Sequence, residues 1–163
     1  MAEAINVFET MQPRDGISAR MAKAYITVDG QRYLLFQANK IEATLEKTKQ
    51  DINILGRPMA GHRATGCSGK GTLTIYYNTS LFTKMAKKYK QTGEETFFDM
   101  QVTNYDPTSR AGKQTIILKN CNLDSVPIIQ ADAGGDWNQQ ELPFTFEDFE
   151  VPETFQDLDG MKL

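Results

Sequence analysis

Residues 66–72, GCSGKGT, combine glycines with a lysine and a threonine, as phosphate-binding loops do. Such a loop needs two glycines with four residues between them, and a lysine that is directly followed by Ser or Thr. Here Ala64 occupies the position of the first glycine, and Gly71 follows Lys70. Residues 72–77 then show the alternation of a strand instead of a helix. We therefore expect a flexible, glycine-rich lead into a strand, and no nucleotide site.

Three other features could carry chemistry: one histidine, an acidic C-terminal region and one tryptophan. The sequence places no nucleophile or orienting partner beside His62, so a solvent-facing or interface position is favoured over catalysis. The carboxylates of region 141–159 match no calcium loop. Trp137 could stack a ligand, but anchoring a loop end in the core is favoured. The sequence thus predicts no enzyme, no metal site and no cofactor.

Composition is typical of a soluble protein of about one domain. The chain has 163 residues, 40% of them hydrophobic and 24% charged, and a formal net charge of −3. This acidic balance disfavours broad adhesion to nucleic acid. Cys67 and Cys121 match no metal or redox spacing, and two free thiols are favoured over one disulfide. Because we find neither an export signal nor a membrane-length apolar run, we expect a cytoplasmic origin and no stable membrane association.

Alternating apolar and polar residues predict a mainly β domain with one helix. The pattern indicates strands over 24–28, 31–36, 40–46, 72–77, 98–103, 114–119, 122–129 and 142–152. The Asp29-Gly30 pair between the first two runs is typical of a hairpin turn. A helix is expected between caps at 78–80 and Gly93, with its lysines on a solvated face and not in a phosphate-binding patch. The sum is about six to nine strands, in a β-sandwich or open β-barrel with one flanking helix.

Three segments do not fit a domain that folds by itself. Residues 1–22 show no clean period and are expected to form an arm that is ordered only if something holds it. Residues 47–70 surround a small apolar island, Ile52 and Ile54, with polar residues and glycines, and we expect a long excursion without regular structure. The last strand is the third segment, because it carries apolar residues on both faces.

In that strand, residues 142–146 place their large apolar side chains on one face, whereas Phe149 and Val151 have the opposite parity. Either a bulge near 147–148 restores the face, or something beyond the sheet covers both faces. Neighbouring copies would supply the contacts that all three segments lack. A head-to-tail interface of that kind closes into rings or runs into filaments.

Several stretches resemble the tail tube proteins of contractile, myovirus-like phage tails, in particular those of PBSX-type prophages. They are LEKTKQDINILGRPMAGHRATG at 45–66, GKGTLTIYY at 69–77 and LPFTFEDFEVPE at 142–153. The resemblance implies a structural subunit that forms hexameric rings. Neighbouring sheets pair into one inner barrel, and the rings stack into a hollow tube. We divide the chain into an arm, 1–22, a tail tube β-domain, 23–155, and a C-terminal tail, 156–163.

The resemblance also implies partners and a location. The partners are the tail sheath, baseplate, tape measure and tail terminator proteins, with transient DNA in the lumen if the phage is infective. The location is the virion tail, or a bacteriocin-like or defective particle, assembled in the bacterial host cytoplasm. The excursion 47–66 is expected to reach a neighbouring subunit or ring. The expected inter-subunit contacts are Lys49, Asp51, Ile52, Asn53, Ile54, Leu55, Arg57, Met59, His62, Arg63, Phe149 and Val151.

Two alternative functions remain open at this point. A ring-forming tube protein of a type VI secretion system would share the fold and the assembly. A monomeric ligand-binding β-barrel would use Trp137 and the excursion 47–66 as a lid, and would be a stable monomer with a pocket.

Overall fold

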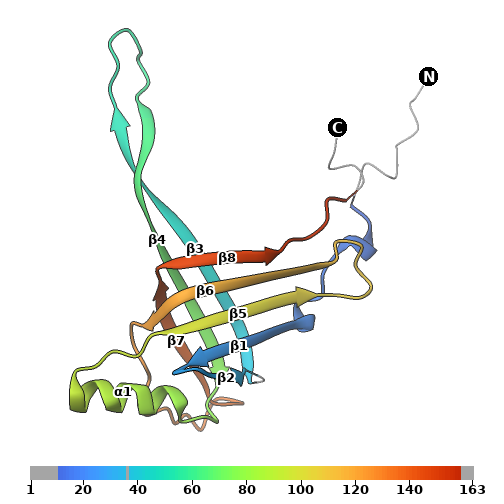
Figure 1. Ribbon diagram of the computed structural model, residues 1–163, viewed down its shortest axis with the longest axis vertical. Helices are drawn as coiled ribbons and strands as arrows, with labels where there is room; N and C mark the ends of the chain where they lie inside the picture. The colour runs from blue at the N-terminus through green and yellow to red at the C-terminus, as the bar shows by residue number, and fades with distance from the viewer. Residues whose placement is uncertain (1–10, 36, 159–163) are drawn as a thin grey trace.

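The computed structural model describes residues 11–35 and 37–158 of the chain. These residues form eight antiparallel strands and one α-helix, and Figure 1 shows the strands folded over one another in two crossing layers. The elements are β1 (Ala22–Val28), β2 (Gln31–Leu34), β3 (Ala38–Ile52), β4 (Gly61–Tyr76), α1 (Leu81–Thr92), β5 (Phe98–Tyr105), β6 (Lys113–Leu123), β7 (Gln139–Phe146) and β8 (Asp148–Glu153). The mainly β architecture with a flanking helix is confirmed.

The two layers are parts of one continuous sheet. Its strand order is β2-β1-β5-β6-β7-β4-β3, and β8 pairs with β6 outside this path. Strand β6 joins the layers because its last two residues, Asn122 and Leu123, pair with Thr145 and Phe144 of β7. Within the described residues, the layer of β1, β5 and β6 therefore ends in β2 on one side and β8 on the other.

A single apolar core fills the space between the layers. Side chains of the first layer meet those of β4 and β7, and Phe82 of α1 closes one end. The fully buried apolar members are Ile26, Leu73, Ile75, Phe82, Met100, Cys121, Leu142 and Phe144. The large side chains of residues 142–146 point into this core, as their alternation predicts.

The predicted helix is present with its expected end. Gly93 has a φ of 72°, and its backbone N–H donates to the Tyr89 carbonyl oxygen at 2.8 Å. Ser80 occupies the N-cap position. The lysines at 84, 87, 88 and 90 are exposed, whereas Phe82 on the opposite face is buried.

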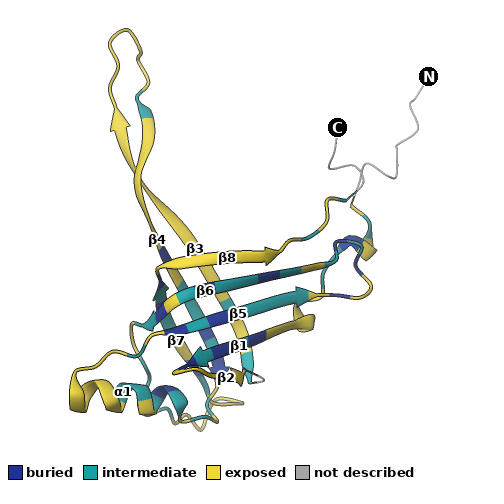
Figure 2. Ribbon diagram, viewed as in Figure 1, coloured by how far each residue is buried: buried dark blue, intermediate teal, exposed yellow. Residues whose placement is uncertain are grey.

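The expectation of an irregular excursion over 47–70 is wrong. Most of that segment belongs to β3 and β4, which pair from Ala38 and Ile75 out to Ile52 and Gly61. Only residues 53–60 lie between the two strands. The reason for the error is physical. Strands are recognised by the alternation of a half-buried face, and the outer part of this hairpin is exposed on both faces, as Figure 2 shows.

The glycines of GCSGKGT lie inside β4, and two of them, Gly69 and Gly71, contact phenyl rings of β7. A Cβ atom on Gly71 would lie 2.4 Å from Phe144 Cζ and 2.6 Å from the Glu42 carbonyl oxygen, and one on Gly69 would lie 2.5 Å from the Phe146 ring. These positions need glycine because the rings rest directly on the backbone. The stretch is thus neither a phosphate loop nor a flexible lead.

Two further strand expectations need correction. Strand β6 ends at Leu123 and residues 124–138 contain no strand, so the predicted strand over 122–129 is wrong beyond its first two residues. The last strand does not bulge but divides at Glu147: β7 pairs with β4, whereas β8 pairs with β6. This change of partner explains the change of parity. Phe36, in the predicted strand 31–36, lies outside the described residues.

We predict that Gly71→Ala lowers the free energy of unfolding by about 1–3 kcal/mol, because the new methyl group overpacks the site against Phe144 and a backbone carbonyl. Gly66→Ala is the matched control, since a Cβ there meets nothing within 4 Å. Urea unfolding of both variants measures the difference. Equal stability of the two variants would contradict this account of the glycines.

Candidate assembly surfaces

The outer half of the β3–β4 hairpin has no core of its own. Every residue from Glu42 to Met59 is exposed, and so are the residues from His62 to Ser68 on the returning strand. The ribbon is held by the ladder of backbone hydrogen bonds between its strands. A pair of strands without a buried face is only marginally stable in water. Both faces of this part of the hairpin are accessible to another molecule.

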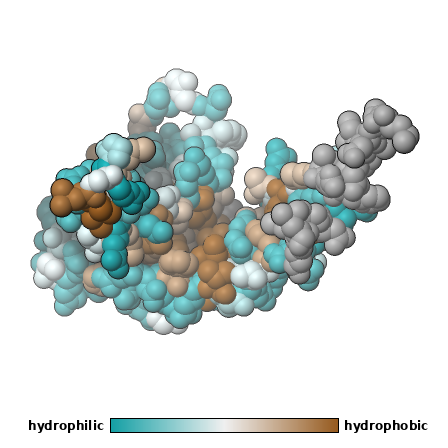
Figure 3. All heavy atoms as spheres, turned by 90° about the horizontal axis from the view of Figure 1, so that it is seen from above, coloured by the Kyte–Doolittle hydropathy of each residue, from teal (hydrophilic) through white to brown (hydrophobic). Residues whose placement is uncertain are grey.

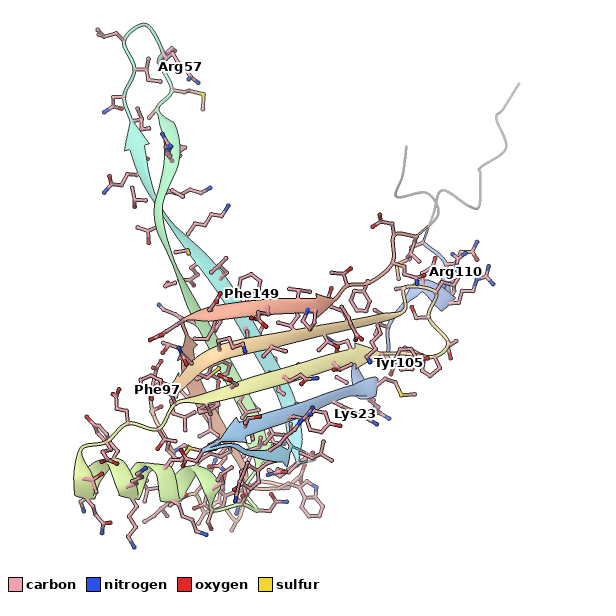
Figure 4. The ribbon with its side chains drawn as sticks, in the orientation of Figure 1. Lys23, Arg57, Phe97, Tyr105, Arg110 and Phe149 are labelled. Atoms are coloured by element: carbon pink, nitrogen blue, oxygen red, sulfur yellow. The ribbon has the colours of Figure 1, made fainter. Side chains whose placement is uncertain are left out.

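The tip of the hairpin, residues 53–60, is apolar at its end. Ile54 and Met59 are exposed, and Leu55 is fully exposed at 102% of its reference area. Figure 3 looks down on this end and shows a hydrophobic patch there, and Figure 4 places Arg57 at the tip. The Arg57 backbone N–H donates to the Ile54 carbonyl oxygen at 3.1 Å, which closes the turn. Burying one such aliphatic side chain contributes about 1.5–3 kcal/mol.

The outermost part of the hairpin, residues 47–66, is basic. Region 47–66 carries Lys47, Lys49, Arg57 and Arg63 against the single carboxylate of Asp51, a balance of +3. His62 Nδ1 lies 2.6 Å from Asp51 Oδ1 across the two strands. The hairpin thus brings the residues expected at 49–63 onto one exposed projection, and their contact with another subunit stays a prediction.

Strand β8 forms a second open surface. In the described residues it pairs only with β6, where Phe149 lies opposite Leu118. Phe149 and Val151 are 42% and 38% exposed. Figure 4 shows Phe149 on this outermost strand of its layer. An edge strand with free backbone groups and apolar side chains is a template for pairing with another strand.

A polar cluster around loop 106–112 holds the described end of the predicted arm. Asp15 Oδ1 accepts a hydrogen bond from Arg110 Nε at 2.7 Å and forms an ion pair with Arg110 Nη2 at 2.6 Å. The Ser18 backbone N–H donates to Asp106 Oδ2 at 2.9 Å. The C-terminal segment joins the same loop, since the Gln156 N–H donates to the Ala111 carbonyl oxygen at 2.7 Å. Residues 1–10 and 159–163 lie outside the described residues.

Both carboxylates of this cluster are stabilised in their charged form. The Gln12 backbone N–H and the Arg110 guanidinium hold the pKa of Asp15 below its ordinary value. The Ser18 and Thr108 backbone N–H groups do the same for the pKa of Asp106. Sequence reasoning missed the cluster, although Asp106-Pro107 is a known turn signal, because Asp15 and Arg110 stand 95 positions apart.

The sequence favours Trp137 as a core anchor, and this expectation is wrong. The Trp137 side chain is 79% exposed. It lies in loop 124–138, at the end of β4 opposite the hairpin tip (Figure 1). Residues 47–66 therefore cannot close over it as a lid. Cys67 is an exposed free thiol, and Cys121 is a buried one whose pKa burial raises to about 12.

The described residues contain no cluster of three His, Cys, Asp or Glu side chains that could hold a metal ion. They also contain no helix long and apolar enough to cross a membrane. Among the exposed surfaces of the described residues are the hairpin and the open edge of β8.

Comparison with known proteins identifies the family of the chain. The profile of a family described as phage tail tube protein matches residues 9–153. The chain belongs to this family. Protein XkdM of the phage-like element PBSX of Bacillus subtilis strain 168 is similar to it, with 37% identity over 142 residues that cover 83% of this chain and 97% of XkdM. The resemblance seen in the sequence is confirmed, and the protein is a structural subunit of a tail tube.

Solved structures share the fold of this chain. A Bacillus subtilis protein of known structure is 35% identical and aligns with a TM-score of 0.50 over 83% of this chain and 99% of its own. A chain of the baseplate of the anti-feeding prophage aligns with a TM-score of 0.63 over 94% of this chain and 100% of its own, at 13% identity. At that identity the second likeness shows the shared fold.

We predict that acid releases residues 11–21 from loop 106–112. The pKa values of Asp15 and Asp106 lie below the ordinary value of 3.8. Their stabilisation is therefore complete above that value and is lost as pH falls through the folded pKa values. An NMR titration of the Ser18 amide from about pH 5 to about pH 2 measures this loss. A Ser18 signal that stays unchanged over that range would contradict the prediction. Asp15→Asn should weaken the attachment at neutral pH, whereas the exposed Glu141→Gln serves as the control.

Proposed function

We propose that this tail tube subunit forms hexameric rings that stack into the hollow inner tube of a contractile tail or a tail-like particle. The observation that carries the proposal is the β3–β4 hairpin, whose outer half projects from the core with every side chain exposed. The relative from the phage-like element PBSX supports the assignment to a prophage-type tail. The protein acts by shape and contact, and not as an enzyme.

Within a ring, the open edge of β8 pairs with the sheet of the neighbouring subunit. The other free edge of the same layer, β2, lies across β1, β5 and β6 from it. Pairing of these edges around a ring removes both of them, as closed barrels do. Phe149 and Val151 then lose their contact with water.

Between subunits or rings, the hairpin supplies the longer contact. Its exposed apolar residues, Ile52, Ile54, Leu55 and Met59, leave water, and the residues Lys49, Asp51, Asn53, Arg57, His62 and Arg63 surround them. Each buried apolar side chain contributes about 1.5–3 kcal/mol, and in a ring every contact occurs once per subunit. We also propose that residues 1–22, 23–155 and 156–163 act as arm, tube domain and tail.

The finished tube works inside a larger particle. A sheath surrounds it, a baseplate starts it, a tape measure protein sets its length, and a terminator ends it. DNA passes through the lumen if the phage is infective, and the acidic balance of −3 avoids tight binding of phosphate. Assembly takes place in the bacterial host cytoplasm before the virion is complete.

The test is assembly of the purified protein at rising concentration. We expect rings or hollow tubes with six-fold end views in negative-stain electron microscopy, together with a rising mass in light scattering. Ile52→Asp with Ile54→Asp should abolish assembly, because two carboxylates would be buried without partners. The monomer should keep its fold, since both side chains are exposed.

Lys87→Gln with Gln91→Glu on α1 is the matched control. It makes the same change in net charge at exposed helical positions and should leave assembly intact. Normal tubes from the Ile52/Ile54 variant would contradict the hairpin contact. A monodisperse monomer at every concentration, even after a baseplate is added to start the tube, would contradict the tube.

A further inference from the structure

A second exposed apolar surface lies at the opposite end of the molecule from the hairpin tip. Loop 124–138 leaves Ile128, Ile129 and Trp137 exposed by 57%, 86% and 79%. The loop is attached at two points: the Tyr77 hydroxyl donates to the Ile128 carbonyl oxygen at 3.0 Å, and the Tyr77 N–H donates to the Asn138 carbonyl oxygen at 2.8 Å. An anchored loop that presents tryptophan and isoleucine to water is typical of a contact surface.

This loop has the opposite charge to the hairpin. Region 124–141 contains Asp124, Asp132, Asp136 and Glu141 and no lysine or arginine, a balance of −4, whereas region 47–66 has a balance of +3. All four acidic residues are exposed. Complementary patches of this kind guide association and set its register.

Strand β4 separates the two surfaces within one chain. It begins at Gly61, beside the tip, and ends at Tyr76, beside the loop, and Figure 1 places the two at opposite ends of the longest axis. Sixteen residues of strand span about 50 Å at 3.3 Å each. The tip of one chain therefore cannot reach its own loop. Complementary patches on opposite ends of one molecule make a head-to-tail contact between copies.

We propose that the hairpin tip, residues 53–60, of one copy docks onto loop 124–138 of a second copy. The apolar end of the tip covers Trp137 and Ile129, and the basic residues of region 47–66 lie against the acidic residues of the loop. This contact rests on the proposed function, because it needs subunits that assemble.

The first test uses Trp137, the single tryptophan of the chain, as its own probe. On assembly its emission should shift to shorter wavelength, and quenching by iodide should fall at least about threefold, because the tip excludes water from the ring. Tubes seen by microscopy in which Trp137 stays as accessible as in the monomer would overturn this contact and leave the tube assignment standing. A wild-type protein that never assembles, even after a baseplate is added, would contradict both.

The second test reverses the charges. Arg57→Glu with Arg63→Glu, and separately Asp124→Lys with Asp136→Lys, should each raise the concentration needed for assembly at least about tenfold. Combining all four changes in one chain should restore most of that loss, since the two patches are again complementary. Asp132 is left unchanged because its carboxylate accepts a hydrogen bond from the Gly134 N–H at 2.9 Å.

Lys87→Glu with Lys90→Glu is the matched control for the reversed hairpin, with the same charge change on exposed residues of α1. Circular dichroism and urea unfolding confirm that each variant is folded before assembly is scored. Two results would overturn the proposed contact. One is a variant with all four changes that assembles no better than either double variant, and the other is double variants that assemble like the wild type.

Discussion

A two-stranded ribbon cannot bury a face of its own, and much of this protein follows from that constraint. Strands β3 and β4 pair with each other over nearly their whole length, yet only the inner part of the pair lies in the core. The outer part keeps its apolar tip in water. An exposed apolar surface of this kind is typical of a site that a second molecule covers.

The junction between core and projection is set by side-chain packing. Phe144 and Phe146 of β7 lie flat on Gly71 and Gly69 of β4, so the last core contacts fall at these glycines. Beyond Gly69, β4 leaves β7 and continues with β3 alone. The same strand thus belongs to the core at one end and to the exposed projection at the other.

The sequence predicted best where one face of an element is buried. Strands β1, β5 and β7 alternate around core residues such as Ile26 and Met100, and the helix ends at Gly93 as its residue type indicates. The sequence predicts irregular structure in the outer hairpin because exposure on both faces removes the alternation of apolar and polar residues. The apolar island at Ile52 and Ile54 is visible in the sequence, and its role as a contact stays a prediction. Contacts between distant residues, such as Asp15 with Arg110, and the exposure of Trp137 depend on the finished fold and have no local signal.

The central claim is that the hairpin tip is a contact between subunits, and amide hydrogen exchange measured in the free and the assembled protein tests it most directly. In the free protein, amides of residues 53–60 should exchange rapidly, because the tip is exposed. The backbone hydrogen bond described within it, from Arg57 N–H to the Ile54 carbonyl oxygen, closes a single turn. In the assembled protein the same amides should exchange much more slowly, while those of α1 stay unchanged. Fast exchange of the tip in both states would contradict the account.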